Sequence, residues 1–199
     1  MHCLHYSRRR RGIINEKAKI IVGVLAFLLL LSAAVFGYNT LRDMGHSPDS
    51  AIAQERERLR APDFTVLDIY SNEIQFYDFL GKPIVLNFWT TWCPNCVAEM
   101  PHFERLYNEM GDEVHFVKVN LLDGERETRG RVNTFMAEHG YTFPIFFDTT
   151  GEASGLYGVR TIPLTVFIDA EGYLVAITQG QIREQELRQG IEMAMGSSE

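Results

Sequence analysis

The chain is poor in cysteine: only Cys3, Cys93 and Cys96 occur in its 199 residues. Three cysteines are too few for the disulfide framework of a small secreted scaffold. A structural zinc site needs four ligands, yet there is no second C-x-x-C, and the H-x-x-H from His2 to His5 lies in the N-terminal tail. We therefore predict no metal site and no bound cofactor.

Positive charge is scarce beyond the N-terminus. Residues 1–19 hold six basic residues and one acidic residue, which gives a net charge of +5. Residues 20–41 are uncharged, so subtracting +5 from the total of −7 leaves −12 for residues 42–199. Because nucleic acid binds basic surfaces, this acidic region is not expected to bind it.

Long apolar runs are also few, which excludes a protein with many membrane spans. One run, IIVGVLAFLLLLSAAVF, covers residues 20–36, and the uncharged stretch continues to Leu41. About 20 apolar residues suffice to cross the roughly 30 Å hydrocarbon core of a bilayer. The basic residues precede the run, so the positive-inside rule places residues 1–19 in the cytoplasm and the rest outside. We predict a transmembrane signal-anchor over residues 20–38, with cleavage near Ser32 as the alternative.

Residues 39–61 are mostly polar and are predicted to form a linker to a folded domain over residues 62–196. The domain begins with two segments that alternate between apolar and polar residues, FTVLDI and IQFYDF. The nearly continuous apolar run at 83–89 then indicates a strand buried on both faces. The remaining pattern predicts helices over 95–110, 127–139 and 184–195, strands over 115–120, 164–169 and 173–178, and a short apolar segment at 143–148. This β-α-β-α-β-β-α order favours one α/β sheet with helices on both faces.

Cys93 and Cys96 stand where the buried strand ends and the next helix begins, in the segment WTTWCPNC. The unpaired N–H groups and the dipole of a helix N-terminus stabilise a thiolate. Pro94 suits the first helical position, since its missing N–H would be unpaired there. We predict that Cys93 attacks and that Cys96, one turn further on, resolves the mixed disulfide. A structural disulfide and half of a zinc site are the alternatives.

Glu99 follows Cys96 by three residues, so the two side chains share one face of the predicted helix. A partly buried carboxylate in this position could accept the proton of Cys96 during exchange. The alternative is an ordinary solvated helix glutamate.

The stretch FLGKPIVLNFWTTWCPNCVAEMP resembles proteins of the thioredoxin fold, and more narrowly the ResA/TlpA group of membrane-anchored bacterial thiol–disulfide oxidoreductases. The segments FPIFFD and YGVRTIPLTVFIDAEG extend this resemblance, which covers residues 61–195 and the anchor. It implies a thioredoxin fold, a central mixed sheet flanked by helices. It also implies a place in the bacterial cell membrane with the catalytic domain outside the cytoplasm.

The resemblance also implies roles for particular residues. Pro163 matches the cis-proline that packs beside the active disulfide, and the residues expected to contact substrate are Trp92, Pro94, Ile162 and Pro163. Ordinary thioredoxins carry an aspartate where this chain has Asn87. Since an asparagine does not titrate, the proton role falls to Glu99.

The expected function is reduction of protein disulfides, with apocytochrome c as one client and a membrane thiol–disulfide carrier as electron donor. The first alternative is a peroxiredoxin-like thiol peroxidase, whose P-x-x-x-T-x-x-C motif is matched by Thr90 but broken by Leu86 in place of the proline. The second is a dithiol oxidase that donates disulfides and differs in reduction potential. A non-enzymatic adaptor that uses the peptide groove is the third.

Overall fold

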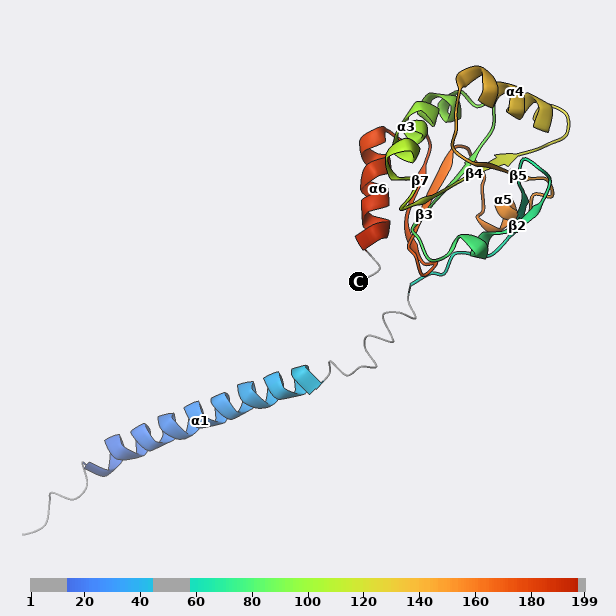
Figure 1. The fold of residues 1–199 in the computed structure, drawn as a ribbon. Coiled ribbons are helices and arrows are strands. Elements are labelled where there is room, and N and C mark those ends of the chain that lie inside the picture. Colours follow the sequence, from blue (N-terminus) through green and yellow to red (C-terminus); the bar gives the residue numbers. More distant parts are fainter. Residues whose placement is uncertain (1–13, 45–57, 197–199) are drawn as a thin grey trace, which may run out of the picture. The chain divides into compact units, whose positions relative to one another are not determined.

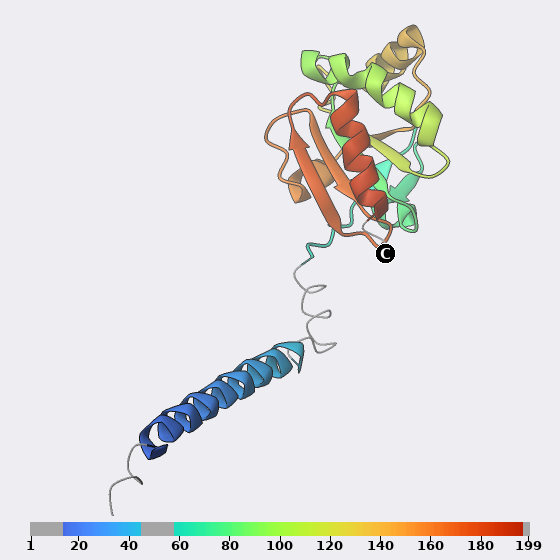
Figure 2. The same ribbon diagram turned by 90° about the vertical axis from the view of Figure 1, so that its left-hand side faces the viewer.

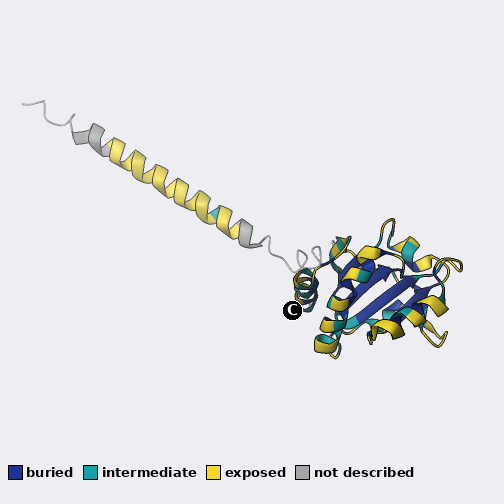
Figure 3. Cartoon of the chain, turned by 90° about the horizontal axis from the view of Figure 1, so that it is seen from above, coloured by how far each residue is buried: buried dark blue, intermediate teal, exposed yellow. Residues whose placement is uncertain are grey.

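The computed structural model describes residues 14–44 and 58–196, which belong to two separate units (Figure 1). In the first unit, helix α1 (Ile14–Met44) contains the segment Lys19–Thr40, which is long and apolar enough to cross a membrane and has no buried residues. Figure 3 shows this exposure along the helix. Most of the predicted basic tail (residues 1–13) and most of the predicted linker (residues 45–57) lie outside the part that the structure describes.

The second unit is a thioredoxin-type domain built on one mixed sheet of seven strands, in the order β2-β1-β5-β4-β3-β6-β7 (Figures 1 and 2). Its strands are β1 (Thr65–Leu67), β2 (Glu73–Gln75), β3 (Ile84–Trp89), β4 (His115–Leu121), β5 (Ile145–Asp148), β6 (Leu164–Ile168) and β7 (Leu174–Gln179). Its helices are α3 (Pro94–Met110), α4 (Arg129–His139), α5 (Glu152–Leu156), α6 (Glu184–Gly196) and the 3₁₀ helix η1 (Phe76–Phe79). The predicted fold class is confirmed.

The sheet has an apolar core on each face, because side chains alternate along its central strand. Val85 and Trp89 of β3 belong to a core that also contains residues of α3, α4 and α6. Leu86 and Phe88 point to the other core, which contains residues of η1 and α5. Figure 3 shows the buried strands between these layers. All six residues of β3 are buried, as its continuous apolar run predicts.

Two differences from the predicted pattern follow from capping side chains. The segment IQFYDF is only partly strand, since β2 ends at Gln75 and the chain turns into η1, where Asp78 closes a capping box with Gln75. Helix α4 begins at Arg129 rather than at residue 127, because the Thr128 side chain accepts the N–H of Arg131 and caps the helix. Glu127 is thereby left outside the helix.

The chain enters the domain at the end of the sheet away from the cysteines. Arg58 forms an ion pair with the buried Asp169, just after β6, and lies over the ring of Tyr173. The N–H of Ala61 donates to the carbonyl of Gly172 in the same turn. Because a strand rises by about 3.3 Å per residue, Asp169 at this entry point is roughly 17 Å from Leu164 at the start of β6.

Candidate active site

Cys93 and Cys96 form a disulfide at the N-terminus of α3, with their Cα atoms 5.2 Å apart. Cys93 is the N-cap residue, and its Sγ accepts the N–H of Cys96 at 3.2 Å. Pro94 occupies the first turn, as predicted, and is exposed. Cys93 keeps 6% of its surface exposed and Cys96 none, so a partner sulfur can approach only Cys93.

The residues predicted to contact substrate surround this disulfide. The peptide bond between Ile162 and Pro163 is cis, and the Sγ of Cys93 lies 3.7 Å from the Ile162 carbonyl oxygen. Trp92 is 38% exposed, while Pro163 is buried. A cavity of about 300 Å³ lies between Trp92 and the segment that ends at Ile162. Trp92, Pro94, Ile162 and Pro163 are thus placed together, and their role in binding stays a prediction.

Glu99 is fully buried, which is not the environment of a solvated helix glutamate. Its Oε1 accepts a hydrogen bond from Asn87 Nδ2 at 2.9 Å, and its Oε2 accepts the N–H of Ile182 at 3.1 Å. Burial raises the pKa of Glu99 above its ordinary value, although the charge of Lys118 and the two hydrogen bonds oppose the rise. A carboxyl group with a raised pKa can take up and release a proton nearer to neutral pH.

The sequence reasoning missed Lys118, which is fully buried on β4. Its Nζ donates to Asn87 Oδ1 at 2.7 Å and lies 3.6 Å from the ring centre of Phe103. Burial lowers the pKa of Lys118 to about 7, against the attraction of Glu99. Asn87 therefore links the lysine to the glutamate. The sequence feature that could have indicated this buried residue is a lysine within the apolar pattern HFVKVN.

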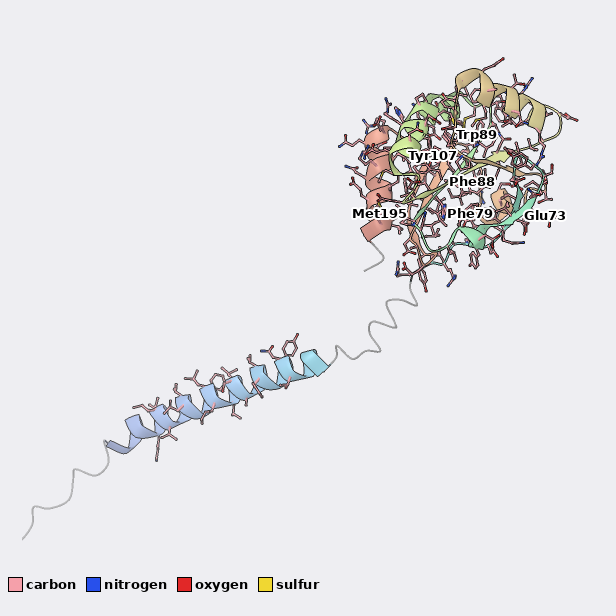
Figure 4. The ribbon with its side chains drawn as sticks, in the orientation of Figure 1. Glu73, Phe79, Phe88, Trp89, Tyr107 and Met195 are labelled. Carbon is pink, nitrogen blue, oxygen red and sulfur yellow. A yellow bond between two sulfur atoms is a disulfide. The ribbon has the colours of Figure 1, made fainter. Side chains whose placement is uncertain are left out.

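A second buried carboxylate, Glu127, was also missed. It accepts hydrogen bonds from the backbone and side chain of Thr91 and from Asn120 Nδ2. Thr91 belongs to the loop that joins β3 to the active-site helix. Figure 4 shows Trp89, the last residue of this strand, inside the domain, and Trp89 packs in the same core as residues of α3 and α4. Within residues 14–44 and 58–196, no three His, Cys, Asp or Glu side chains form a potential metal site.

Comparisons with known proteins agree with this geometry. The AhpC/TSA family matches residues 58–177. Thiol-disulfide oxidoreductase ResA of Geobacillus thermodenitrificans is 31% identical over 182 residues, which cover 90% of this chain and 98% of the relative. Thioredoxin-like protein YneN of Bacillus subtilis is 31% identical over 166 residues, or 83% of this chain and 94% of the relative.

Two solved structures share the fold. StoA from Bacillus subtilis is 30% identical, with a TM-score of 0.57, and the match covers 65% of this chain and 96% of StoA. A putative thiol:disulfide interchange protein DsbE from Chlorobium tepidum is 26% identical, with a TM-score of 0.61, and the match covers 69% of this chain and 96% of that protein. With its Cys93–Cys96 pair at the start of α3, the chain belongs to the AhpC/TSA family within the thioredoxin superfamily, and it is a ResA-like thiol–disulfide oxidoreductase.

Proposed function

We propose that this protein reduces protein disulfides on the outer side of a bacterial membrane. The observation that carries the proposal is the buried Glu99, three residues after the buried resolving cysteine Cys96. Resolution of a mixed disulfide requires the Cys96 thiol to lose its proton inside the protein, and Glu99 is a base on the same helix face. The catalytic residues in this proposal are Cys93, Cys96 and Glu99.

The reaction begins with the thiolate of Cys93, which attacks one sulfur of the client disulfide. The client S–S bond breaks, a mixed disulfide forms, and the released client thiolate takes a proton from water. Glu99 then removes the proton of Cys96, and the Cys96 thiolate attacks the sulfur of Cys93. The Cys93–Cys96 disulfide forms, and the second client thiolate leaves and takes up that proton. Two electrons have passed to the client, and a membrane dithiol carrier returns two electrons and two protons.

The client segment is proposed to lie in extended form beside the Ile162–Pro163 bond, against Trp92 and Pro94. The cavity of about 300 Å³ between Trp92 and Ile162 offers room for a side chain next to the attacked cysteine. An unfolded client with an accessible disulfide fits this open arrangement better than a folded protein does. Apocytochrome c, whose C-x-x-C-H haem site is reduced before haem attachment, is a client of this kind.

The proposed topology has a cytoplasmic tail (1–19), a single signal-anchor (20–38), a linker (39–61) and an extracytoplasmic catalytic domain (62–196). It is supported by the apolar segment Lys19–Thr40 and by the basic residues that precede it. The chain enters the domain at Arg58, at the end of the sheet away from Cys93. The outer compartment lacks the thiol pool of the cytosol, which makes a dedicated electron donor necessary.

The reduction potential of the Cys93–Cys96 pair tests the proposed direction. The full chain, purified in detergent, is equilibrated with redox buffers, and the fraction of reduced pair is read by thiol alkylation. A potential near that of thioredoxin, about −270 mV, supports a reductase. A value near that of strong oxidants, about −120 mV, would show that the protein donates disulfides instead.

A further inference from the structure

Glu127 holds the loop that leads into the active site. Its Oε1 accepts the backbone N–H of Thr91 at 2.7 Å and Asn120 Nδ2 at 2.6 Å. Its Oε2 accepts the Thr91 hydroxyl at 2.6 Å. The side chain is fully buried, so these three donors take the place of water.

Three hydrogen-bond donors face the carboxyl oxygens of Glu127, which is an environment suited to a carboxylate. Asn120 turns its NH₂ group toward Glu127 although its own Oδ1 is then buried without a partner among the residues that the structure describes. Within that same part of the chain no Lys, Arg or His side chain forms an ion pair with Glu127. The negative charge is balanced by neutral donors only.

The loop that Glu127 holds leads directly to the attacking cysteine. Thr91 precedes Cys93 by two residues, so their Cα atoms are at most about 7 Å apart. Besides the buried Glu99 and Lys118 described above, two exposed charges are near: Arg126, whose guanidinium lies 3.9 Å from the ring centre of Trp92, and Asp123, which accepts the N–H of Glu127. Both are exposed, so water screens them, whereas the charge of Glu127 is buried.

We propose that Glu127 is a positioning residue that sets the redox poise of the Cys93–Cys96 pair, its buried negative charge favouring the disulfide over the dithiol form. A nearby negative charge disfavours the Cys93 thiolate. A cysteine pair whose reduced form is stabilised is a strong oxidant. Because the negative charge destabilises the reduced form here, it makes the Cys93–Cys96 pair a better reductant. The inference rests on the proposed function, because it explains how the site is poised to reduce clients.

The test is Glu127→Gln, which removes the charge and can keep every hydrogen bond. The glutamine Oε1 still accepts from Thr91 N–H and from Asn120, while its Nε2 donates to the Thr91 hydroxyl, which turns to accept. In the full-length protein, equilibrium with glutathione buffer is expected to shift about 3- to 10-fold toward the dithiol. A tenfold shift corresponds to about 30 mV. When the alkylation rate of Cys93 is measured against pH, the thiolate should form at a lower pH in Glu127→Gln than in the wild type.

Thr91→Val is the matched control, because it removes one hydrogen bond to the same carboxylate but leaves the charge. Its equilibrium with glutathione should stay within twofold of the wild type, and thermal unfolding checks that both variants fold. An unchanged equilibrium for Glu127→Gln would overturn the inference, and so would an equal shift in Thr91→Val, which would reveal a purely structural role. The wild-type potential tests the reductase proposal separately, since the inference concerns only the difference between variant and wild type.

Discussion

Replacement of the buried lysine, Lys118→Met, should change the pH dependence of disulfide exchange. The two hydrogen bonds of 2.7 and 2.9 Å through Asn87 place the Lys118 ammonium within about 8 Å of the Glu99 carboxylate. Below neutral pH the ammonium is charged, because burial lowers the pKa of Lys118 only to about 7. Its positive charge then favours the ionised form of Glu99, which is the form that accepts the Cys96 proton.

The size of the effect follows from this separation. At 8 Å and an effective dielectric constant of about 20, two unit charges attract each other by about 2 kcal/mol. This energy corresponds to about 1.5 pH units. In Lys118→Met the pKa of Glu99 should therefore rise further above its ordinary value, and the acidic limb of the rate profile should move up by about this amount. Methionine matches the length of the lysine stem and suits the aromatic surroundings of Phe103.

The assay is stopped-flow reduction of a fluorescent peptide disulfide by the pre-reduced full-length protein, between pH 4 and pH 8. Lys82→Met is the matched control: it removes the same charge from an exposed position, where Lys82 Nζ donates to the carbonyl of Asp112. The control should keep the wild-type profile. An unchanged acidic limb in Lys118→Met, with the protein folded, would refute the electrostatic coupling between Lys118 and Glu99.

Three further predictions concern catalysis and stability. Glu99→Gln should slow exchange by about 100-fold while thermal unfolding shows an intact fold, and a rate profile equal to the wild type at every pH would exclude Glu99 as the base. Between pH 7 and pH 10 the unfolded chain binds a proton at Lys118 that the folded chain does not, since burial lowers this pKa to about 7. In urea titrations, the free energy of unfolding of the wild type should then rise with pH relative to that of Lys118→Met, by up to about 1.4 kcal/mol per pH unit. Parallel pH dependences of the two proteins would contradict this prediction. Gly190→Ala should cost about 1–3 kcal/mol of stability, because the added Cβ would lie 2.2 Å from the Phe167 ring, whereas Gly130→Ala meets nothing within 4 Å and should cost nothing.

The main features of the fold could be predicted from the sequence because they depend on local pattern. The apolar run of β3 and the helical spacing after it placed Cys93 at a strand-to-helix junction, and the structure has it there. The short helix α5 was not predicted, since its five residues are too few to show a period. The sequence pattern predicts a helix that includes Glu127, whereas the cap at Thr128 excludes this residue from the helix.

Glu99 and Asn87 were predicted to belong to the site, but their link to Lys118 could not be predicted, because it depends on sheet register. Asn87 is the Cα partner of Lys118 on one neighbouring strand and of Thr165 on the other. These residues are far apart in the sequence, and a shift of one residue in either pairing would turn the side chains to opposite faces. A lysine within a strand pattern usually indicates an exposed face. Only the assembled sheet places Lys118 over Phe103, under the active-site helix.

The same register explains why asparagine and glutamate occur together at this site. Asn87 accepts from Lys118 through Oδ1 and donates to Glu99 and Thr165 through Nδ2. An aspartate at position 87 could accept from Lys118, but it would place a second carboxylate about 3 Å from that of Glu99, where two like charges cannot both ionise. An amide is the side chain that can accept on one side and donate on the other. Once the titrating carboxylate is carried by the helix at Glu99, the strand position must therefore be neutral, and Asn87→Asp should raise the pKa of the carboxyl pair rather than add a second base.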